Sequence, residues 1–235
     1  MKIVCFGDSL TRGVSIVKGR LRILKENYPS FLQELFSQNK EADVSVINKG
    51  VFNDNSDLLL SRLEKDVVNE KPDYAIIGIG GNDCNFDWSN VAEHPEKEHQ
   101  AIVPLERYVE NVKIIISTIQ NTGITPVILN LPPLDPVRYY KNISSRYSNS
   151  ISHWISKVGG IEHWHGLYNR HLNNLINELG VRKVDVRTAL KQAGDLLYLI
   201  SDDGIHLTSE GYKILSTEIY QSFANIEVGK QTQPC

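Results

Sequence analysis

Residues at the two ends of the chain have the types and the spacing that nucleophilic catalysis needs. Ser9 follows Gly7 and Asp8 directly after a short apolar run, and Asp203 and His206 lie three positions apart near the C-terminus. In a turn or at a helix start, that spacing puts both side chains on one face. A carboxylate that accepts the Nδ1–H of an imidazole fixes the tautomer and leaves Nε2 as a base. Such a base could take the proton of Ser9, whose hydroxyl is otherwise a weak nucleophile.

Two further residues have the chemistry of an oxyanion hole. Taken alone, the Asp203–His206 pair is a weak signal, because a solvated aspartate near a hydrogen-bonded histidine has the same spacing. Acyl transfer also requires hydrogen-bond donors aimed at the developing oxyanion. Gly50 follows a second apolar run and offers an N–H with no Cβ in its way, and Asn82 follows a third run and carries a side-chain NH2 group. Together these residues supply a nucleophile, a base, an orienting carboxylate and an oxyanion hole.

The elements that must position these residues are short apolar runs that alternate with longer amphipathic segments. The runs predict buried strands over residues 2–6, 44–47, 74–79, 126–131 and 183–186. Apolar residues with helical spacing predict helices over residues 28–36, 57–68, 105–119, 164–179 and 208–223. This alternation predicts a three-layer α/β/α fold, a doubly wound parallel sheet of about five strands. Ligands bind at the carboxyl ends of the strands in such sheets.

The chain length favours a single domain. We expect this domain over residues 1–225, followed by a tail over residues 226–235. Two polar stretches near residues 84–103 and 134–163 leave from strand ends and interrupt the alternation. We interpret them as insertions or lids on the substrate side, with surface decoration as the alternative. The aromatic residues Tyr139, Trp154 and Trp164, in or beside the second stretch, either line a substrate pocket or form a small core of the insertion.

Charge and composition argue against several classes of partner. The chain has 25 Lys and Arg against 28 Asp and Glu, a formal charge of −3, so no nucleic-acid partner is expected. The most basic stretch, residues 18–25, is interrupted by apolar residues and favours an amphipathic surface segment over an anion site. Three cysteines do not indicate a disulfide framework, and no apolar run of about 18 residues predicts a membrane span. No signal peptide is recognisable, so the expected location is the cytoplasm.

Four motifs occur in the same order as in a known family. With these motifs the chain resembles the GDSL-type SGNH hydrolases, serine esterases and lipases, from Met1 to about Phe223. The motifs are Gly7-Asp8-Ser9-Leu10, the glycine of Asn48-Lys49-Gly50, Gly80-Gly81-Asn82-Asp83 and Asp203-Gly204-Ile205-His206. The letters S, G, N and H of the family name fall on Ser9, Gly50, Asn82 and His206.

The resemblance implies a flavodoxin-like sheet and a serine hydrolase that cleaves carboxylic esters through an acyl-enzyme on Ser9. It implies an oxyanion hole formed by the backbone N–H groups of Ser9 and Gly50 and by the side chain of Asn82. The substrate is a small-molecule ester, and a small acyl ester, an acetylated sugar and a lysophospholipid all stay open. No metal or organic cofactor is expected. The chain departs from the family's second motif at Asn53, where glycine is common, which puts the shape of that loop in question.

Other interpretations of the same residues stay open. An acyltransferase would use the same triad with an alcohol in place of water. A non-catalytic flavodoxin-like binding module is a third interpretation, but no G-x-G-x-x-G or G-x-x-x-x-G-K-[ST] loop follows a strand. Asp202 could orient the histidine, although the family spacing favours Asp203. Asp8 either contacts substrate or accepts backbone hydrogen bonds that shape its turn.

A group of histidines raises the question of a metal site. His153, His163, His165 and His171 lie near one another in the sequence, and a His-x-His pair is compatible with zinc. No cysteine is nearby, and the predicted helix places His171 on its apolar face, so no metal site is predicted. The sequence leaves the oligomeric state open.

Overall fold

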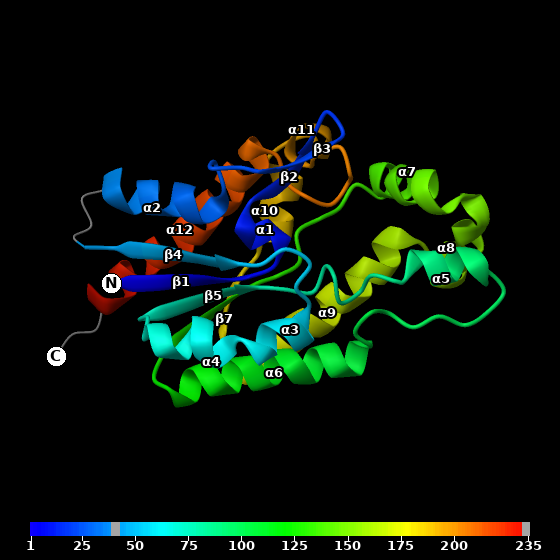
Figure 1. The fold of residues 1–235 in the computed structure, drawn as a ribbon. Coiled ribbons are helices and arrows are strands. Elements are labelled where there is room, and N and C mark those ends of the chain that lie inside the picture. The colour runs from blue at the N-terminus through cyan, green and yellow to red at the C-terminus, as the bar shows by residue number, and fades with distance from the viewer. Residues whose placement is uncertain (39–42, 232–235) are drawn as a thin grey trace.

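A five-stranded parallel sheet lies between two layers of helices (Figure 1). This computed structural model describes residues 1–38 and 43–231. The strands stand in the order β4-β1-β5-β6-β7, and every neighbouring pair is parallel. Their bounds are Lys2–Gly7 for β1, Ser45–Gly50 for β4, Tyr74–Gly78 for β5, Thr125–Leu129 for β6 and Arg182–Val184 for β7. The predicted fold class is confirmed, and each predicted strand is present with slightly shifted ends.

Alternate residues of β1 belong to two hydrophobic cores, one on each face of the sheet. Val4 and Phe6 pack in the core formed with α3 (Ser56–Ser61), α4 (Leu63–Asp66), α6 (Leu105–Asn121) and α9 (Ile161–Leu179). Ile3 and Cys5 pack in the core formed with α2 (Tyr28–Gln38), α10 (Val186–Gln192), α11 (Leu196–Leu199) and α12 (Ser209–Gln231). Successive side chains of a strand point to opposite faces, so a continuous apolar run is buried on both sides.

Two helical segments differ from the prediction. The helix expected over residues 57–68 is divided at Arg62 into α3 and α4, and a 3-10 turn, η1 (Val68–Glu70), follows. Helix α12 continues to Gln231, so the tail expected over residues 226–235 is helical up to that residue. Residues 232–235 lie outside the described residues. Across the described ranges, no helix has the length and the hydropathy that a membrane span requires.

Residues 14–23 form a β-hairpin that the sequence analysis did not predict. Strand β2 (Val14–Val17) pairs antiparallel with β3 (Arg20–Ile23). The connecting residues Lys18 and Gly19 have φ values of 52° and 69°, and two positive φ values are what a type I′ hairpin turn requires. The basic stretch over residues 18–25, expected to be an amphipathic surface segment, is therefore largely this turn and an exposed strand.

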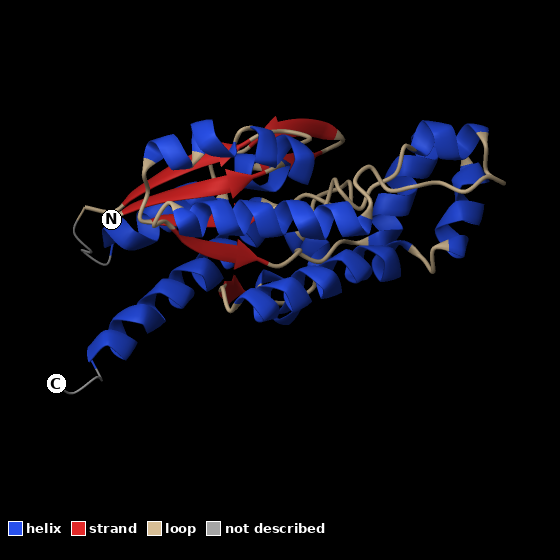
Figure 2. Ribbon diagram, turned by 90° about the horizontal axis from the view of Figure 1, so that it is seen from below, coloured by secondary structure: helices blue, strands red, loops and turns tan. Residues whose placement is uncertain are grey.

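Both polar insertions fold into helices beyond the carboxyl ends of the strands. The first contains α5 (Trp88–Glu93), and the second contains α7 (Pro136–Tyr147), the 3-10 turn η2 (Asn149–Ile151) and α8 (Ser152–Lys157). We call α5, α7, η2 and α8 the cap. The cap projects from the end of the sheet in both Figure 1 and Figure 2. Trp88 and Trp154 of the cap pack edge to face on Phe86, which precedes α5, with ring centroids 5.4 Å and 5.7 Å away.

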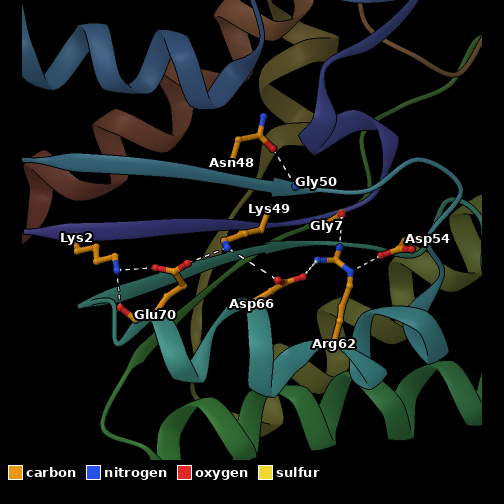
Figure 3. Close-up of polar contacts among 9 residues, drawn as sticks. All are labelled: Lys2, Gly7, Asn48, Lys49, Gly50, Asp54, Arg62, Asp66 and Glu70. Carbon is orange, nitrogen blue, oxygen red and sulfur yellow. Dashed lines mark hydrogen bonds and ion pairs between the residues drawn. The ribbon is translucent and has the colours of Figure 1, made fainter.

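Arg62 ties the carboxyl end of β1 to the loop that follows β4. Its guanidinium donates to the backbone O of Gly7 at 2.9 Å, to Asp54 Oδ2 at 2.6 Å and to Asp66 Oδ2 at 2.8 Å (Figure 3). The same group lies 4.4 Å from the centroid of the Phe6 ring. Because Asp54 is only 5% exposed, it depends on Arg62 for the stabilisation of its charge.

We therefore expect Arg62→Met to lower the free energy of unfolding by about 3 kcal/mol, because it leaves Asp54 and Asp66 without their common partner. Urea denaturation at neutral pH measures the change. Arg107→Met is the matched control, since Arg107 is 64% exposed and pairs with Asp57 at 2.8 Å. Its loss should stay below about 1 kcal/mol. Equal losses in the two variants would contradict the role given to Arg62.

Candidate active site

The sheet brings Ser9 and His206 into direct contact. The two residues are 197 positions apart in the chain, and His206 Nε2 lies 2.9 Å from Ser9 Oγ. Ser9 is the first residue of α1 (Ser9–Arg12), immediately after β1, and His206 lies in the loop that leads into α12. On the other side of the ring, His206 Nδ1 lies 2.5 Å from Asp203 Oδ2. This arrangement can activate a serine through a histidine that a carboxylate orients.

The Asp203 carboxylate is held in the ionised form. Its Oδ1 accepts from Ser201 Oγ at 2.9 Å and from the backbone N–H groups of Ile205 and His206 at 3.1 Å each. Burial opposes ionisation, but the hydrogen bond and the charge of His206, with the two backbone donors, outweigh it and lower the pKa of Asp203 to about 2. Asp202 is exposed and accepts from the Gly19 N–H at 3.4 Å.

Two hydrogen-bond donors near this triad have no acceptor among the described residues. Asn82 follows β5, and its Nδ2 donates one hydrogen to the backbone O of Asp54 at 2.7 Å. That bond orients the amide, and the second Nδ2 hydrogen has no acceptor among the described residues. The backbone N–H of Ser9 is likewise without a described acceptor, because the first N–H groups of a helix have no partner within it. These two groups match the expected donors of an oxyanion hole.

Gly50 does not present a free donor, and the expectation for this residue is corrected. Its N–H donates to Asn48 Oδ1 at 2.9 Å (Figure 3). A Cβ at Gly50 would lie 2.2 Å from the backbone N of Arg12, so glycine is needed here for the close packing of β4 against α1. The glycine of the second motif therefore has a packing role, and its amide is already used.

Asn53 is a donor that the sequence analysis missed. It has φ of 63°, a left-handed conformation that glycine adopts freely and that asparagine tolerates better than most residues. Its N–H has no acceptor among the described residues, and the carbonyl of the next residue, Asp54, accepts from Asn82. The signal was present in the sequence, because asparagine replaces a glycine that commonly occupies this position.

Two buried carboxyl groups, Asp8 and Asp83, lie next to Ser9 and Asn82 in the chain. Asp8 Oδ1 accepts from the Leu10 N–H at 2.9 Å and caps α1, and burial raises its pKa to about 7. This bond shapes the turn that carries Ser9. Asp83 is 0% exposed, its Oδ1 accepts from the Ser56 N–H at 2.9 Å, and its Oδ2 has no described partner. Burial outweighs the bonds from Ser56 and raises the pKa of Asp83 to about 6.

Of the aromatic residues expected either to line a substrate pocket or to form a small core, some line a cavity and one is buried inside the cap. Tyr139 and Trp164 line a cavity that begins beside the triad, and Asp8 lines it too. Trp154 does not belong to the cavity wall. It packs against Phe86 and against His99, whose ring centroid is 5.0 Å away, so it is a core residue of the cap. A substrate-binding role for Trp154 is therefore not supported by its position.

The four histidines do not converge on a common point. His165 is buried, and its Nδ1 accepts from Arg187 Nη1 at 3.2 Å, whereas His153, His163 and His171 are exposed. The expected place of His171 on the apolar face of its helix is wrong, because α9 turns Tyr168 and Leu172 toward the core instead. Within the described part of the chain, no three His, Cys, Asp or Glu residues are placed to hold a metal ion.

Known proteins share both the sequence pattern and the fold. The model of the GDSL-like lipase/acylhydrolase family matches residues 5–214. A GDSL esterase/lipase of Arabidopsis thaliana is 26% identical over 99% of this chain and 89% of its own length, and the uncharacterized lipoprotein YqeF of Bacillus subtilis is 25% identical over 91% and 85%.

Solved structures extend the likeness in fold. A lipase/acylhydrolase from Enterococcus faecalis has a TM-score of 0.72 at 20% identity and covers 94% of both chains. Axe2, an acetylxylan esterase from Geobacillus stearothermophilus, has a TM-score of 0.66 at 19% identity over 94% of this chain and 93% of its own.

Replacing the buried Asp83 carboxyl should remove a pH-dependent loss of folding stability. Between the ordinary Asp pKa of about 4 and the raised value of about 6, the folded state binds a proton that the unfolded state lacks. Stability therefore falls as the pH rises through this window, and at pH 7.5 the folded protein carries the whole cost of the buried charge. Asp83→Asn keeps an oxygen for the Ser56 N–H and should raise the free energy of unfolding by about 2 kcal/mol at pH 7.5.

At pH 4 the same variant should differ little from the wild type. Urea denaturation at the two pH values measures both differences. The control is Asp202→Asn at an exposed position, which should leave the pH dependence of the wild type in place. A destabilised Asp83→Asn protein at pH 7.5 would show that the carboxylate is needed for folding.

Proposed function

Because the chain belongs to the GDSL-like lipase/acylhydrolase family and is a carboxylic ester hydrolase, we propose that it cleaves its substrate through an acyl-enzyme on Ser9. The observation that carries the proposal is the continuous hydrogen-bonded chain from Ser9 Oγ through His206 to Asp203. A binding module that performs no chemistry has no need for a serine hydroxyl and a carboxylate on the two nitrogens of one imidazole.

In the acylation step, His206 Nε2 takes the proton of Ser9 while Ser9 Oγ attacks the carbonyl carbon of the ester. The new C–O bond turns the carbonyl oxygen into an oxyanion. Asp203, ionised because its pKa is lowered to about 2, stabilises the imidazolium that forms. When the intermediate collapses, the ester C–O bond breaks, and His206 returns the proton to the leaving alcohol.

In the deacylation step, a water molecule takes the place of the alcohol. His206 Nε2 accepts a proton from this water, and the resulting hydroxide attacks the acyl carbon. The bond to Ser9 Oγ then breaks, the proton passes from His206 to the serine oxygen, and the carboxylic acid leaves. The imidazole therefore acts as a base and then as an acid in each half of the cycle.

We assign the oxyanion hole to the Ser9 N–H, the free Nδ2 hydrogen of Asn82 and the N–H of Asn53. The bond from Asn82 Nδ2 to the Asp54 carbonyl supports this set, because it holds the amide of Asn82 beside the loop that carries Asn53. Arg62 holds the Asp54 carboxylate at 2.6 Å and so fixes the same loop. Donors that are positioned in advance need no reorganisation when charge develops on the substrate oxygen.

Removal of the nucleophile tests the mechanism directly. Ser9→Ala should lower kcat for a nitrophenyl ester by at least about 10⁴-fold and abolish labelling by a fluorophosphonate probe, while circular dichroism stays that of the wild type. Ser61→Ala, at an exposed serine of α3, should keep both activities. Retention of most of the turnover by Ser9→Ala would refute the assignment.

The amide of Asn82 offers a second test. Asn82→Ala should lower kcat by about 10²- to 10³-fold, or about 2.7–4 kcal/mol of transition-state stabilisation. Asn174→Ala, at an exposed position on α9, is the control and should leave kcat unchanged. Thermal unfolding of both variants shows whether the bond to Asp54 matters for stability. An unchanged kcat in Asn82→Ala would place the oxyanion hole elsewhere.

A further inference from the structure

A cavity that is partly open to solvent begins beside the triad and extends under the cap. At the triad end it is lined by the neighbours of the three catalytic groups. Leu10 follows Ser9, Gly81 precedes Asn82, and Ile205 precedes His206. At the other end it reaches Ile155 and Val158 at α8. The reacting carbonyl and the cavity are therefore adjacent, and a group attached to that carbonyl can enter the cavity.

The wall is apolar although it contains tryptophan, tyrosine and asparagine. Trp88 Nε1 donates to Asn85 Oδ1 at 2.8 Å and lies 3.0 Å from the Tyr139 hydroxyl, and that hydroxyl donates to Asn85 Oδ1 at 2.7 Å. Trp164 Nε1 donates to the Cys84 carbonyl at 2.7 Å. Because the two indole N–H groups, the Tyr139 hydroxyl and Asn85 Oδ1 already have partners within the protein, the rings offer carbon surface to a ligand. A sugar, whose hydroxyls need free donors and acceptors, fits such a wall poorly.

No lysine or arginine is among the described residues that line the cavity. His165 lines it, but burial and the nearby charge of Arg187 lower the pKa of this histidine to about 3, so it is neutral at neutral pH. Asn130, another wall residue, uses its Nδ2 on Asp185 at 2.7 Å and its Oδ1 on the Arg187 N–H at 3.0 Å. Asp8 is the acidic residue of the wall, and it lies at the triad end with its Oδ1 on the Leu10 N–H.

We propose that this cavity holds the acyl chain of the substrate, so that the enzyme prefers esters of linear medium-chain carboxylic acids to acetyl esters, acetylated sugars included. This inference rests on the proposed acyl-enzyme at Ser9. The acyl group stays bonded to Ser9 while water attacks, whereas the alcohol has to leave first. A deep apolar cavity under the cap therefore suits the group that remains through deacylation, and its burial strengthens binding with each methylene.

The test is a series of nitrophenyl esters from acetate through butyrate and hexanoate to octanoate, each below its micellar concentration. We expect kcat/KM to rise about three- to fourfold per added methylene across the series. A second series of acetate esters, with alcohols from ethyl to octyl, should show a much smaller rise. A flat profile or a preference for acetate in the first series would overturn the proposal, and so would a steep rise confined to the second.

Variants of the cavity wall near α8 test whether the cavity causes the chain-length preference. Val158→Trp fills the cavity under α8 and should lower the octanoate-to-acetate ratio of kcat/KM by about tenfold or more. Val137→Trp is the matched control, because Val137 is 61% exposed on α7 of the same cap and should keep the wild-type ratio. If thermal unfolding shows that Val158→Trp does not fold, Ile161→Trp tests the same wall. An unchanged ratio in the folded variant would overturn the proposal.

The two proposals fail in distinguishable ways. Failure of the acyl-enzyme shows as turnover by Ser9→Ala whatever the chain length. Failure of the acyl cavity shows as a lost or reversed chain-length preference in an enzyme that still depends on Ser9.

Discussion

The contact of 2.9 Å between His206 Nε2 and Ser9 Oγ depends on how the rest of the structure positions these two residues. Ser9 is placed by β1, an interior strand of the sheet, and His206 by a loop closed through the Ser201 N–H to His206 O bond of 2.7 Å. A proton can pass between the two side chains only if both backbones are held to within a few tenths of an ångström. The parallel sheet provides that precision, because the carboxyl ends of its strands meet at one edge.

The cap covers the cavity and also contacts the loop that carries Asp203 and His206. The N–H of Asp135 donates to the Gly204 carbonyl at 2.9 Å, and a Cβ at Gly204 would lie 2.4 Å from the backbone N of Tyr139. Helix α7 therefore packs directly on the segment between Asp203 and His206, which glycine with φ of 79° makes possible. The element that covers the cavity therefore also contacts the loop that carries His206.

The sheet and its main helices could be read from the sequence because burial on both faces leaves continuous apolar runs, which do not depend on distant partners. The hairpin over residues 14–23 could not be read in this way, because the four residues of β3 alternate between arginine and an apolar residue but are all exposed and form no continuous buried run. The division of the helix at Arg62 was also hidden, since the guanidinium bonds to Gly7 and Asp54 on other elements. Such contacts exist only once the layers have packed.

The residue types of the site follow from the amino-acid sequence alone, because a serine, a histidine and a carboxylate at strand ends and loops have few other uses in that order. Which amide groups are free to donate depends on how the chain folds. Gly50 donates to Asn48, and Asn53 takes the left-handed conformation that leaves its own N–H without a described partner. The availability of a donor depends on which acceptor the fold brings within about 3 Å, and a linear pattern of residues does not contain that distance.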